Sequence, residues 1–346
     1  MLGGVVVMRA VFIILLGLLI QMSASNVGLA SELVLYNWPI YLADEVKQQF
    51  TQESGYHIRE LHYDSDDARN RLLLSAHPPY FDIVIADHLT LQNPQIQQRL
   101  LPLQNLVLPQ VPTDLRNKCG NYAIPYMRGS LGYAYRQDKI TLPLQTWHDL
   151  LSQAPSLSQH LVLIDDARAL SAIALKALGY SINSQSRNEL QQAFMLLKST
   201  SPYVLTYRYS LSAISDPAVG DQVYAVVTYN GDFYAIQQHS PHHDWRFVSP
   251  AEGSLLWLDC LAIFKDSQQT EIATQFIQFV SRVEIANLNS ERLGFNPILH
   301  EHLISNKIIS NPIAYQDGEY TRKSEYYSDS VDGDRVRSII YYSVLK

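Results

Sequence analysis

The sequence predicts an α/β fold made of two lobes that face each other across a cleft. Apolar strands and amphipathic helices alternate along the chain, and several of the strands stop at aromatic residues or carboxylates. A strand–helix–strand order indicates parallel strands joined by right-handed crossovers. In open α/β sheets, ligands lie beyond the carboxyl ends of the strands. We therefore expect two separate sets of strand ends to meet at one ligand site.

The first set of strands belongs to the N-terminal part of the chain. We expect strands at 33–36, 57–63 and 81–86, separated by helices at 42–51 and 68–76. The run Ser65, Asp66, Asp67 offers an N-cap for the second helix. The aromatic residues Trp38 and Tyr41, and the carboxylate of Asp87, follow strand ends.

The second set repeats this order in the middle of the chain. We expect a strand at 161–164 followed by a helix at 167–178, and a strand at 223–228 followed by a helix from Phe233. These strands end at Asp165-Asp166 and at Tyr229-Asn230-Gly231-Asp232. A further amphipathic helix is expected at 271–282.

The N-terminus has the layout of a secretory signal peptide. Arg9 precedes the apolar run from Ala10 to Ile20, and small residues follow as far as Ala30. The apolar run is short for a transmembrane helix, which leaves a retained N-terminal anchor as the weaker alternative. We therefore expect a signal peptide at 1–30 and an exported protein in the periplasm.

Composition and charge favour a globular protein with cationic partners. The chain is 47% apolar and has a net charge of −7, without a cluster of lysine and arginine that would indicate nucleic-acid binding. Its length suits two lobes with ordinary cores, and we expect a monomer. The two cysteines, Cys119 and Cys260, either pair in an oxidising compartment or remain free thiols.

The pair Trp257 and Asp259 is the strongest single indication of a ligand. Residues two apart on a strand share one face, and the strand around them is otherwise apolar. A buried carboxylate needs a cationic or hydrogen-bonding partner, and an indole face also attracts cations. This pair suits an alkylammonium ligand. The alternative is an aspartate whose carboxylate accepts hydrogen bonds from backbone amides near a strand end.

Eight short motifs in order resemble one protein family over nearly the whole mature chain. They are 35–41 (LYNWPIY), 50–55 (FTQESG), 81–84 (FDIV), 122–126 (YAIPY), 165–168 (DDAR), 178–181 (LGYS), 257–259 (WLD) and 293–297 (LGFNP). The chain resembles the periplasmic spermidine/putrescine-binding proteins of the ABC-transporter solute-binding class. The resemblance implies a periplasmic binding protein fold, in which two α/β lobes joined by crossing hinge strands close on the ligand.

The resemblance also implies lobe boundaries and ligand-binding residues. The expected lobes are 31–130 with 258–303, and 131–257 with 304–346. The positions that match the family's ligand-binding residues are Trp38, Tyr41, Asp87, Asp166, Tyr229, Trp257, Asp259, Phe295 and Tyr327. Helix capping is the alternative role for Asp87 and Asp166, and core packing is the alternative for Tyr41 and Phe295.

Three departures from the family pattern change the charge expected near the ligand, while Tyr229 replaces a tryptophan of the family and Phe295 a tyrosine. A serine of the family falls at Asp87, which adds a carboxylate. The glutamate that usually follows the arginine of the DDAR motif is Ala169, and the family's tryptophan after the YAIPY motif is replaced by Arg128. The loss of the glutamate changes the expected register of the ligand, and Asp87 is a candidate to replace it.

Three functions follow from these expectations. The first is a periplasmic sensor of norspermidine or spermidine that reports to a membrane GGDEF/EAL-type protein and controls biofilm formation through cyclic-di-GMP. The second is the substrate-binding subunit of a polyamine ABC importer, with a permease as partner. The third, an enzyme or metal carrier, is disfavoured because the sequence assembles no nucleophile with a base, and its histidine clusters lack metal-ligand spacing. We expect no cofactor and no metal.

Overall fold

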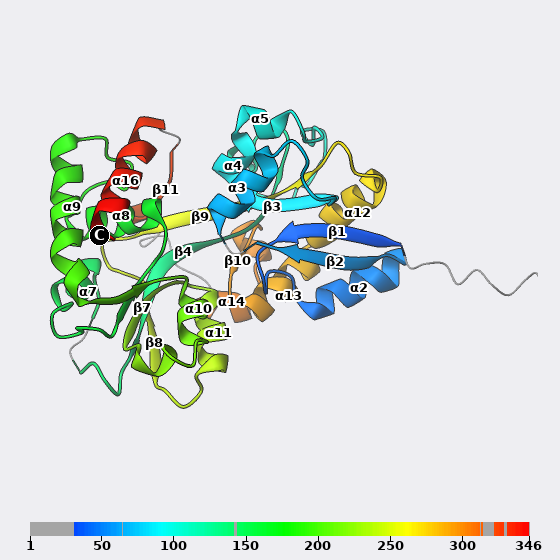
Figure 1. Ribbon diagram of the computed structural model, residues 1–346. Coiled ribbons are helices and arrows are strands. Elements are labelled where there is room, and N and C mark those ends of the chain that lie inside the picture. Colours follow the sequence, from blue (N-terminus) through cyan, green and yellow to red (C-terminus); the bar gives the residue numbers. More distant parts are fainter. Residues whose placement is uncertain are drawn as a thin grey trace, which may run out of the picture.

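The structure is a computed structural model that describes residues 31–63, 65–141, 144–311, 313, 322–328 and 331–345. The expected signal peptide at 1–30 lies outside these residues. Figure 1 shows two α/β lobes side by side, connected by long strands that run through both. None of the helices in the described residues is both long and apolar enough to cross a membrane.

In the first lobe, helices cover both faces of a parallel sheet. Strand β1 (Glu32–Asn37) lies between β2 (His57–His62) and β3 (Ile83–Asp87), and both pairings are parallel. Alternate residues of β1 point to opposite faces, so that Leu33 and Leu35 join one core cluster and Val34 and Tyr36 another. The helices are α2 (Asp44–Ser54), α3 (Asp66–Leu74), α4 (His88–Gln92), α5 (Pro94–Gln97), α6 (Thr113–Lys118), α12 (Thr270–Val280) and α13 (Val283–Leu293). The short helix α14 (Asn306–Ile309) lies in the range expected for the second lobe, but its Ile308 is in one cluster with Val283 and Ala286 of α13.

The second lobe repeats this architecture. Strand β5 (Leu161–Leu163) lies between β6 (Val204–Tyr207) and β7 (Ala225–Tyr229), again with parallel pairing, and β8 (Trp245–Val248) adds an antiparallel strand on β4 (Ile124–Arg136). One core cluster contains residues of α7 (Trp147–Ser152), α8 (Ala167–Ala177), α9 (Arg187–Thr200) and α16 (Val331–Val344). A second cluster contains residues of α10 (Ser210–Ile214) and α11 (Asp232–His239).

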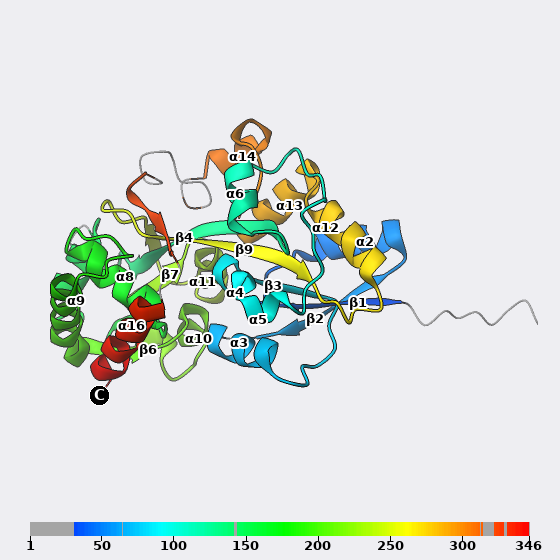
Figure 2. The same ribbon diagram turned by 90° about the horizontal axis from the view of Figure 1, so that it is seen from above.

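Two long antiparallel strands connect the lobes. Strand β4 pairs with β9 (Leu255–Ile263) over its first part and with β7 over its last part. The sheet order is β2-β1-β3-β9-β4-β7-β5-β6, with β10 (Asn296–Pro297) added to β4 and β11 (Glu325–Tyr326) added to β9. Figure 2 shows β4 and β9 passing from one lobe to the other. The expected lobe boundaries at 130/131 and 257/258 fall inside these two strands, and they stay predictions until hinge motion is measured.

The predicted α/β fold is confirmed, with one difference in strand direction. Strands β1 to β3 and strands β5 to β7 are parallel as expected, but β9 pairs antiparallel with β3, and β4 pairs antiparallel with β7 and β8. The sheet is therefore mixed, because the two crossing strands return the chain between the lobes. The open question of the cysteines also has an answer: Cys119 and Cys260 form a disulfide in the core of the first lobe, with their Cα atoms 6.0 Å apart.

Candidate functional site

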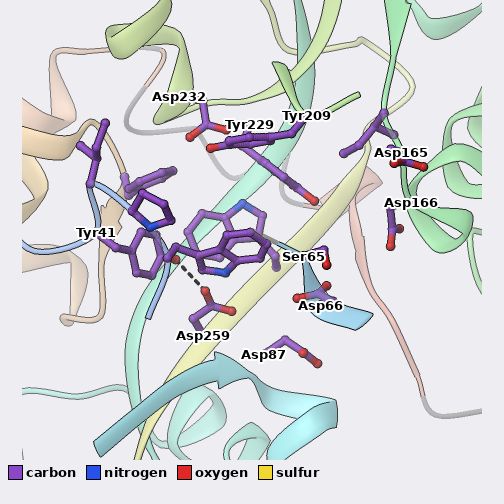
Figure 3. Close-up of a pocket in the computed structure, with 16 residues that line it drawn as sticks. Tyr41, Ser65, Asp66, Asp87, Asp165, Asp166, Tyr209, Tyr229, Asp232 and Asp259 are labelled. Atoms are coloured by element: carbon purple, nitrogen blue, oxygen red, sulfur yellow. Dashed lines mark hydrogen bonds between the residues drawn. The ribbon is translucent and has the colours of Figure 1, made fainter. Parts of the chain in front are cut away.

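A cavity lies between the lobes, where the ends of strands from both lobes meet. Its volume of about 200 Å³ is below the ~300–1,000 Å³ of pockets that hold drug-sized ligands, so it suits a small molecule. Figure 3 shows aromatic side chains in its centre and carboxylates around them. The sixteen lining residues are Trp38, Pro39, Ile40, Tyr41, Ser65, Asp66, Asp87, Ile164, Asp165, Asp166, Tyr209, Tyr229, Asp232, Trp257, Asp259 and Phe295.

Trp257 is the centre of the aromatic wall. Its ring centroid lies 5.2 Å from that of Phe295 and 6.2 Å from those of Tyr41 and Tyr229. Gly129 faces Trp257 across the β4–β9 pairing, and a Cβ atom at Gly129 would lie only 2.6 Å from the indole. The absence of a side chain at this glycine therefore lets the indole lie across β4.

Trp38 forms a second part of the wall and touches both lobes. Its ring centroid lies 4.6 Å from that of Tyr63 in its own lobe and 6.4 Å from that of Tyr209, which precedes α10 in the other lobe. The cavity thus has apolar aromatic faces along its length. Such faces pack well against methylene groups and attract cations.

Asp259 lies on β9 two residues after Trp257, and both residues line the cavity, as their spacing predicts. The side chain is 6% exposed, and its Oδ2 accepts a 2.8 Å hydrogen bond from the hydroxyl of Tyr41. Burial raises the pKa of Asp259 to about 7, although the hydrogen bond from Tyr41 lowers it. The nearby charge of Asp87 raises the pKa further. At neutral pH this carboxyl group is therefore only about half ionised, and a cation placed next to it would favour the charged form.

Asp87 has protein partners of its own. It caps α4 by accepting a 2.9 Å hydrogen bond from the backbone amide of Thr90. Its Oδ2 also lies 2.6 Å from a guanidinium nitrogen of Arg69. Burial raises the pKa of Asp87, but the charge of Arg69 and the hydrogen bonds from Thr90 outweigh it and bring the pKa to about 2. The sequence indicated the cap as an alternative role but did not indicate Arg69.

Asp166 lines the cavity from the second lobe and caps α8. Its Oδ1 accepts a 2.6 Å hydrogen bond from the backbone amide of Ala169, whose side chain is fully buried in the core of that lobe. Capping and lining are therefore compatible for this residue, since its carboxylate stands at the positive end of the helix dipole. Asp165 lies beside it on the cavity wall (Figure 3).

Asp232 and Tyr209 line the cavity and were not among the predicted site residues. Asp232 is 8% exposed, and its Oδ2 has no hydrogen-bond partner among the described residues. Burial raises the pKa of Asp232 to about 7, and the hydroxyl of Tyr209 works against this rise. A signal for Asp232 was present, because it follows the same strand end as Tyr229. Tyr209 follows a strand that the sequence analysis did not predict.

The structure brings together eight of the nine predicted site residues. Trp38, Tyr41, Asp87, Asp166, Tyr229, Trp257, Asp259 and Phe295 all line the cavity. Tyr327 is not among the lining residues, and its hydroxyl donates a hydrogen bond to the backbone carbonyl of Arg168. Arg128, the unexpected cation of the sequence, is also absent from the lining.

The two-lobed fold with a ligand cavity between the lobes defines a solute-binding protein. The profile of the bacterial extracellular solute-binding protein family matches residues 45–315. The chain belongs to this family.

Individual relatives agree with this assignment. The chain is 30% identical over 270 residues to a norspermidine sensor of Vibrio cholerae, covering 76% of this chain and 73% of the relative. It is 26% identical to a spermidine/putrescine-binding periplasmic protein of Salmonella typhimurium, over 95% of both chains. A solved spermidine/putrescine ABC transporter substrate-binding protein from Streptococcus pneumoniae has the same fold, with a TM-score of 0.75 at 23% identity, covering 91% of this chain and all of that one.

Proposed function

We propose that the protein binds a polyamine of the norspermidine/spermidine type in the cavity between its lobes and releases it chemically unchanged. The observation that carries the proposal is the composition of the cavity wall. It combines aromatic faces from both lobes with six carboxylates, and none of its sixteen lining residues, all in the described part of the chain, is a lysine or arginine. Methylene runs suit the aromatic faces, and ammonium groups suit the carboxylates.

Two buried carboxylates, one from each end of the aromatic wall, are the main anchors in this proposal. Asp259 comes from a crossing strand and Asp232 from the second lobe, and no lysine or arginine forms a salt bridge with either one among the described residues. An ammonium group at each would supply the missing charge. The ligand's chain would then lie against Trp257 between them. A ligand that touches both lobes stabilises the closed arrangement.

The site of action in this proposal is the periplasm. The signal-peptide pattern at 1–30 and the Cys119–Cys260 disulfide both suit export to an oxidising compartment. The relatives with 26% identity are named as periplasmic proteins. Fractionation of cells that produce the full chain tests the location, and mass spectrometry of the mature N-terminus tests cleavage after Ala30.

For the biological role, we propose a sensor that reports to a membrane GGDEF/EAL-type protein and so controls biofilm formation. The similarity to the norspermidine sensor supports this role. The alternative is the substrate-binding subunit of a polyamine ABC importer, supported by the relatives that match over most of their length. Deletion of the gene distinguishes the two. A sensor changes cyclic-di-GMP levels and biofilm mass while polyamine uptake persists, whereas an importer subunit abolishes uptake of labelled polyamine.

Calorimetry against a panel of diamines, triamines and tetraamines tests the proposed ligand class. We expect at least one triamine to bind at a single site, and the bound ligand to be recovered unchanged by mass spectrometry. Amino acids and simple sugars serve as negative controls. The proposal fails if no polyamine binds to the folded protein, and the non-catalytic role fails if the recovered ligand has been altered.

A further inference from the structure

Arg69 is a buried cation directly behind the carboxylates of the cavity. It projects from α3, and its side chain is 1% exposed. One guanidinium nitrogen lies 2.6 Å from the carboxylate of Asp66, and another lies 2.6 Å from that of Asp87. Both aspartates line the cavity, where Figure 3 shows them close together and on the far side from Asp232.

Other contacts fix the guanidinium in this position. It donates a 2.9 Å hydrogen bond to the hydroxyl of Thr90, which itself donates to Asp87 at 2.5 Å. It also stacks over the ring of Tyr63, 5.2 Å from the centroid, and Tyr63 packs against Trp38 of the cavity wall. Because an arginine side chain stays charged at all physiological pH values, this corner of the cavity holds a permanent internal cation.

The internal cation divides the carboxylates of the cavity into two kinds. Asp66 and Asp87 already have a positive partner, and Arg69 together with the Thr90 hydrogen bonds brings the pKa of Asp87 to about 2. Asp232 and Asp259 have no such partner, since neither forms a salt bridge to a lysine or arginine in the part of the chain that the structure describes. An ammonium group placed at Asp66 and Asp87 would meet the guanidinium as a like charge.

We propose that Arg69 is a specificity-determining residue: its guanidinium takes the place of a ligand ammonium at Asp66 and Asp87, and so limits how many ammonium groups a polyamine can place in the cavity. This inference rests on the proposed polyamine function. It predicts that the protein discriminates against the tetraamine spermine in favour of triamines. Specificity of this kind is a difference of affinities, achieved by a repulsive element in the site.

The test measures the ratio of spermine affinity to spermidine affinity by calorimetry. In the unaltered protein, spermidine is expected to bind about tenfold or more tightly than spermine. Arg69→Met keeps the side-chain length and removes the charge, so the ratio is expected to move about tenfold or more towards spermine. Arg69→Lys keeps a positive charge and is expected to leave the ratio within about threefold of the starting value.

A matched control separates this effect from the general loss of a buried arginine. Arg136 is 5% exposed and pairs with Asp138 at 2.9 Å at the end of β4, outside the cavity lining. Arg136→Met is expected to leave the ratio unchanged. The inference is overturned if Arg69→Met leaves the ratio within about threefold of the unaltered protein, or if Arg136→Met shifts it equally.

A second variant covers the case in which Arg69→Met does not fold, as judged by circular dichroism. Asp87→Asn keeps Arg69 and leaves it with Asp66 alone, so the corner becomes more positive. The ratio is then expected to move about tenfold further against spermine, and an unchanged ratio overturns the inference. Failure of the unaltered protein to bind any polyamine instead refutes the proposed function, which makes the two failures distinguishable.

Discussion

The carboxylates of the cavity differ in charge state because their neighbours differ. Asp87 is buried but has Arg69 and Thr90 as partners, which bring its pKa to about 2. Asp259 and Asp232 are buried without a lysine or arginine salt-bridge partner among the described residues, and burial raises the pKa of each to about 7, in Asp259 against the lowering effects of the Tyr41 hydrogen bond and the charge of Arg69. A cationic ligand is therefore expected to complete the ionisation of these two groups when it binds.

Replacement of Asp259 by asparagine tests the first of these anchors. The change keeps the shape of the side chain and its contact with Tyr41 but removes the negative charge. We expect it to weaken polyamine binding by about 2–5 kcal/mol, as for the loss of one partner of a buried charge pair. Isothermal calorimetry gives the difference directly.

The control for that change is Asp138→Asn. Asp138 pairs with Arg136 on the surface of the second lobe and does not line the cavity. This variant is expected to bind as the unaltered protein does. Equal affinity of a folded Asp259→Asn protein and the unaltered protein would contradict the role of Asp259.

The raised pKa values predict that polyamine affinity depends on pH. Because the ligand needs ionised carboxylates, affinity is expected to increase as the pH rises towards 7 and to level off above it. Below pH 7, each of the two groups costs up to about tenfold in affinity per pH unit. Calorimetric titrations with polyamine between about pH 5.5 and 8 measure how steeply the affinity depends on pH. In the Asp259→Asn variant this dependence should be weaker, because, of the two carboxyl groups, only Asp232 still titrates in that range.

Stability of the ligand-free protein is expected to change in the opposite direction. A carboxyl group whose pKa is higher in the folded state than in the unfolded state favours folding in its protonated form. The contribution of Asp259 and Asp232 is complete below pH 4 and is lost as the pH rises through about 7. Denaturant titrations of the ligand-free protein at several pH values measure this loss of stability. The prediction is contradicted if the double variant Asp232→Asn with Asp259→Asn has the same dependence of stability on pH as the unaltered protein.

At the scale of elements, the sequence predicted those features of the site that depend on the local residue pattern of a single strand or helix. The β-strand period placed Trp257 and Asp259 on one face, and the strand ends indicated the positions of Trp38, Tyr41 and Asp87. The pairing of Arg69 with Asp87 could not be predicted in this way. It joins α3 to the end of β3, and only the packing of that helix against the sheet brings the two side chains together.

The direction of the two crossing strands also could not be predicted from the local sequence pattern. Strand β9 reads as an apolar run that fits a parallel or an antiparallel partner equally well. Its antiparallel pairing with β3 places Asp259 directly opposite Asp87. This register explains why the two carboxylates influence each other, and it follows from the path of the chain between the lobes.

The disulfide connects two elements of the first lobe across a long stretch of chain. Cys119 is the C-cap residue of α6, Cys260 lies on β9 next to Asp259, and the two are 141 positions apart in the sequence. Closing a loop of that length stabilises the folded state by up to about 5 kcal/mol in the chain-entropy estimate. We expect the double change Cys119→Ala with Cys260→Ala to lower the free energy of unfolding by about 2–5 kcal/mol.

Denaturant unfolding of the oxidised protein and of the double variant measures this loss. The control is the same measurement on the unaltered protein under reducing conditions. Reduction of the disulfide should lower the free energy of unfolding by the same amount as the double substitution. A double variant as stable as the oxidised protein would contradict the prediction. A folded double variant should still bind polyamine, because neither sulfur lines the cavity.

At the scale of the whole molecule, the two lobes already touch across the cavity. Trp38 from the first lobe approaches Tyr209 from the second, and the side chain of Asn230 donates a 3.4 Å hydrogen bond to the carbonyl of Gly294. The buried residues of the first lobe and those of the second lobe form separate core clusters. Opening would therefore separate Trp38 from Tyr209 while each lobe keeps its own core.

Tryptophan fluorescence should report this movement and the binding of ligand together. Trp38 and Trp257 line the cavity, so a polyamine bound there as proposed would change their surroundings directly. The other two indoles are buried in the second lobe: Trp147 is fully buried and donates a hydrogen bond to the carbonyl of Gly253, and Trp245 is 3% exposed.

We expect polyamine to change the tryptophan emission of the unaltered protein. Trp38→Phe and Trp257→Phe should each reduce that change, while Trp147→Phe and Trp245→Phe should preserve it. A ligand signal that disappears only with Trp147→Phe would place the binding event away from the cavity.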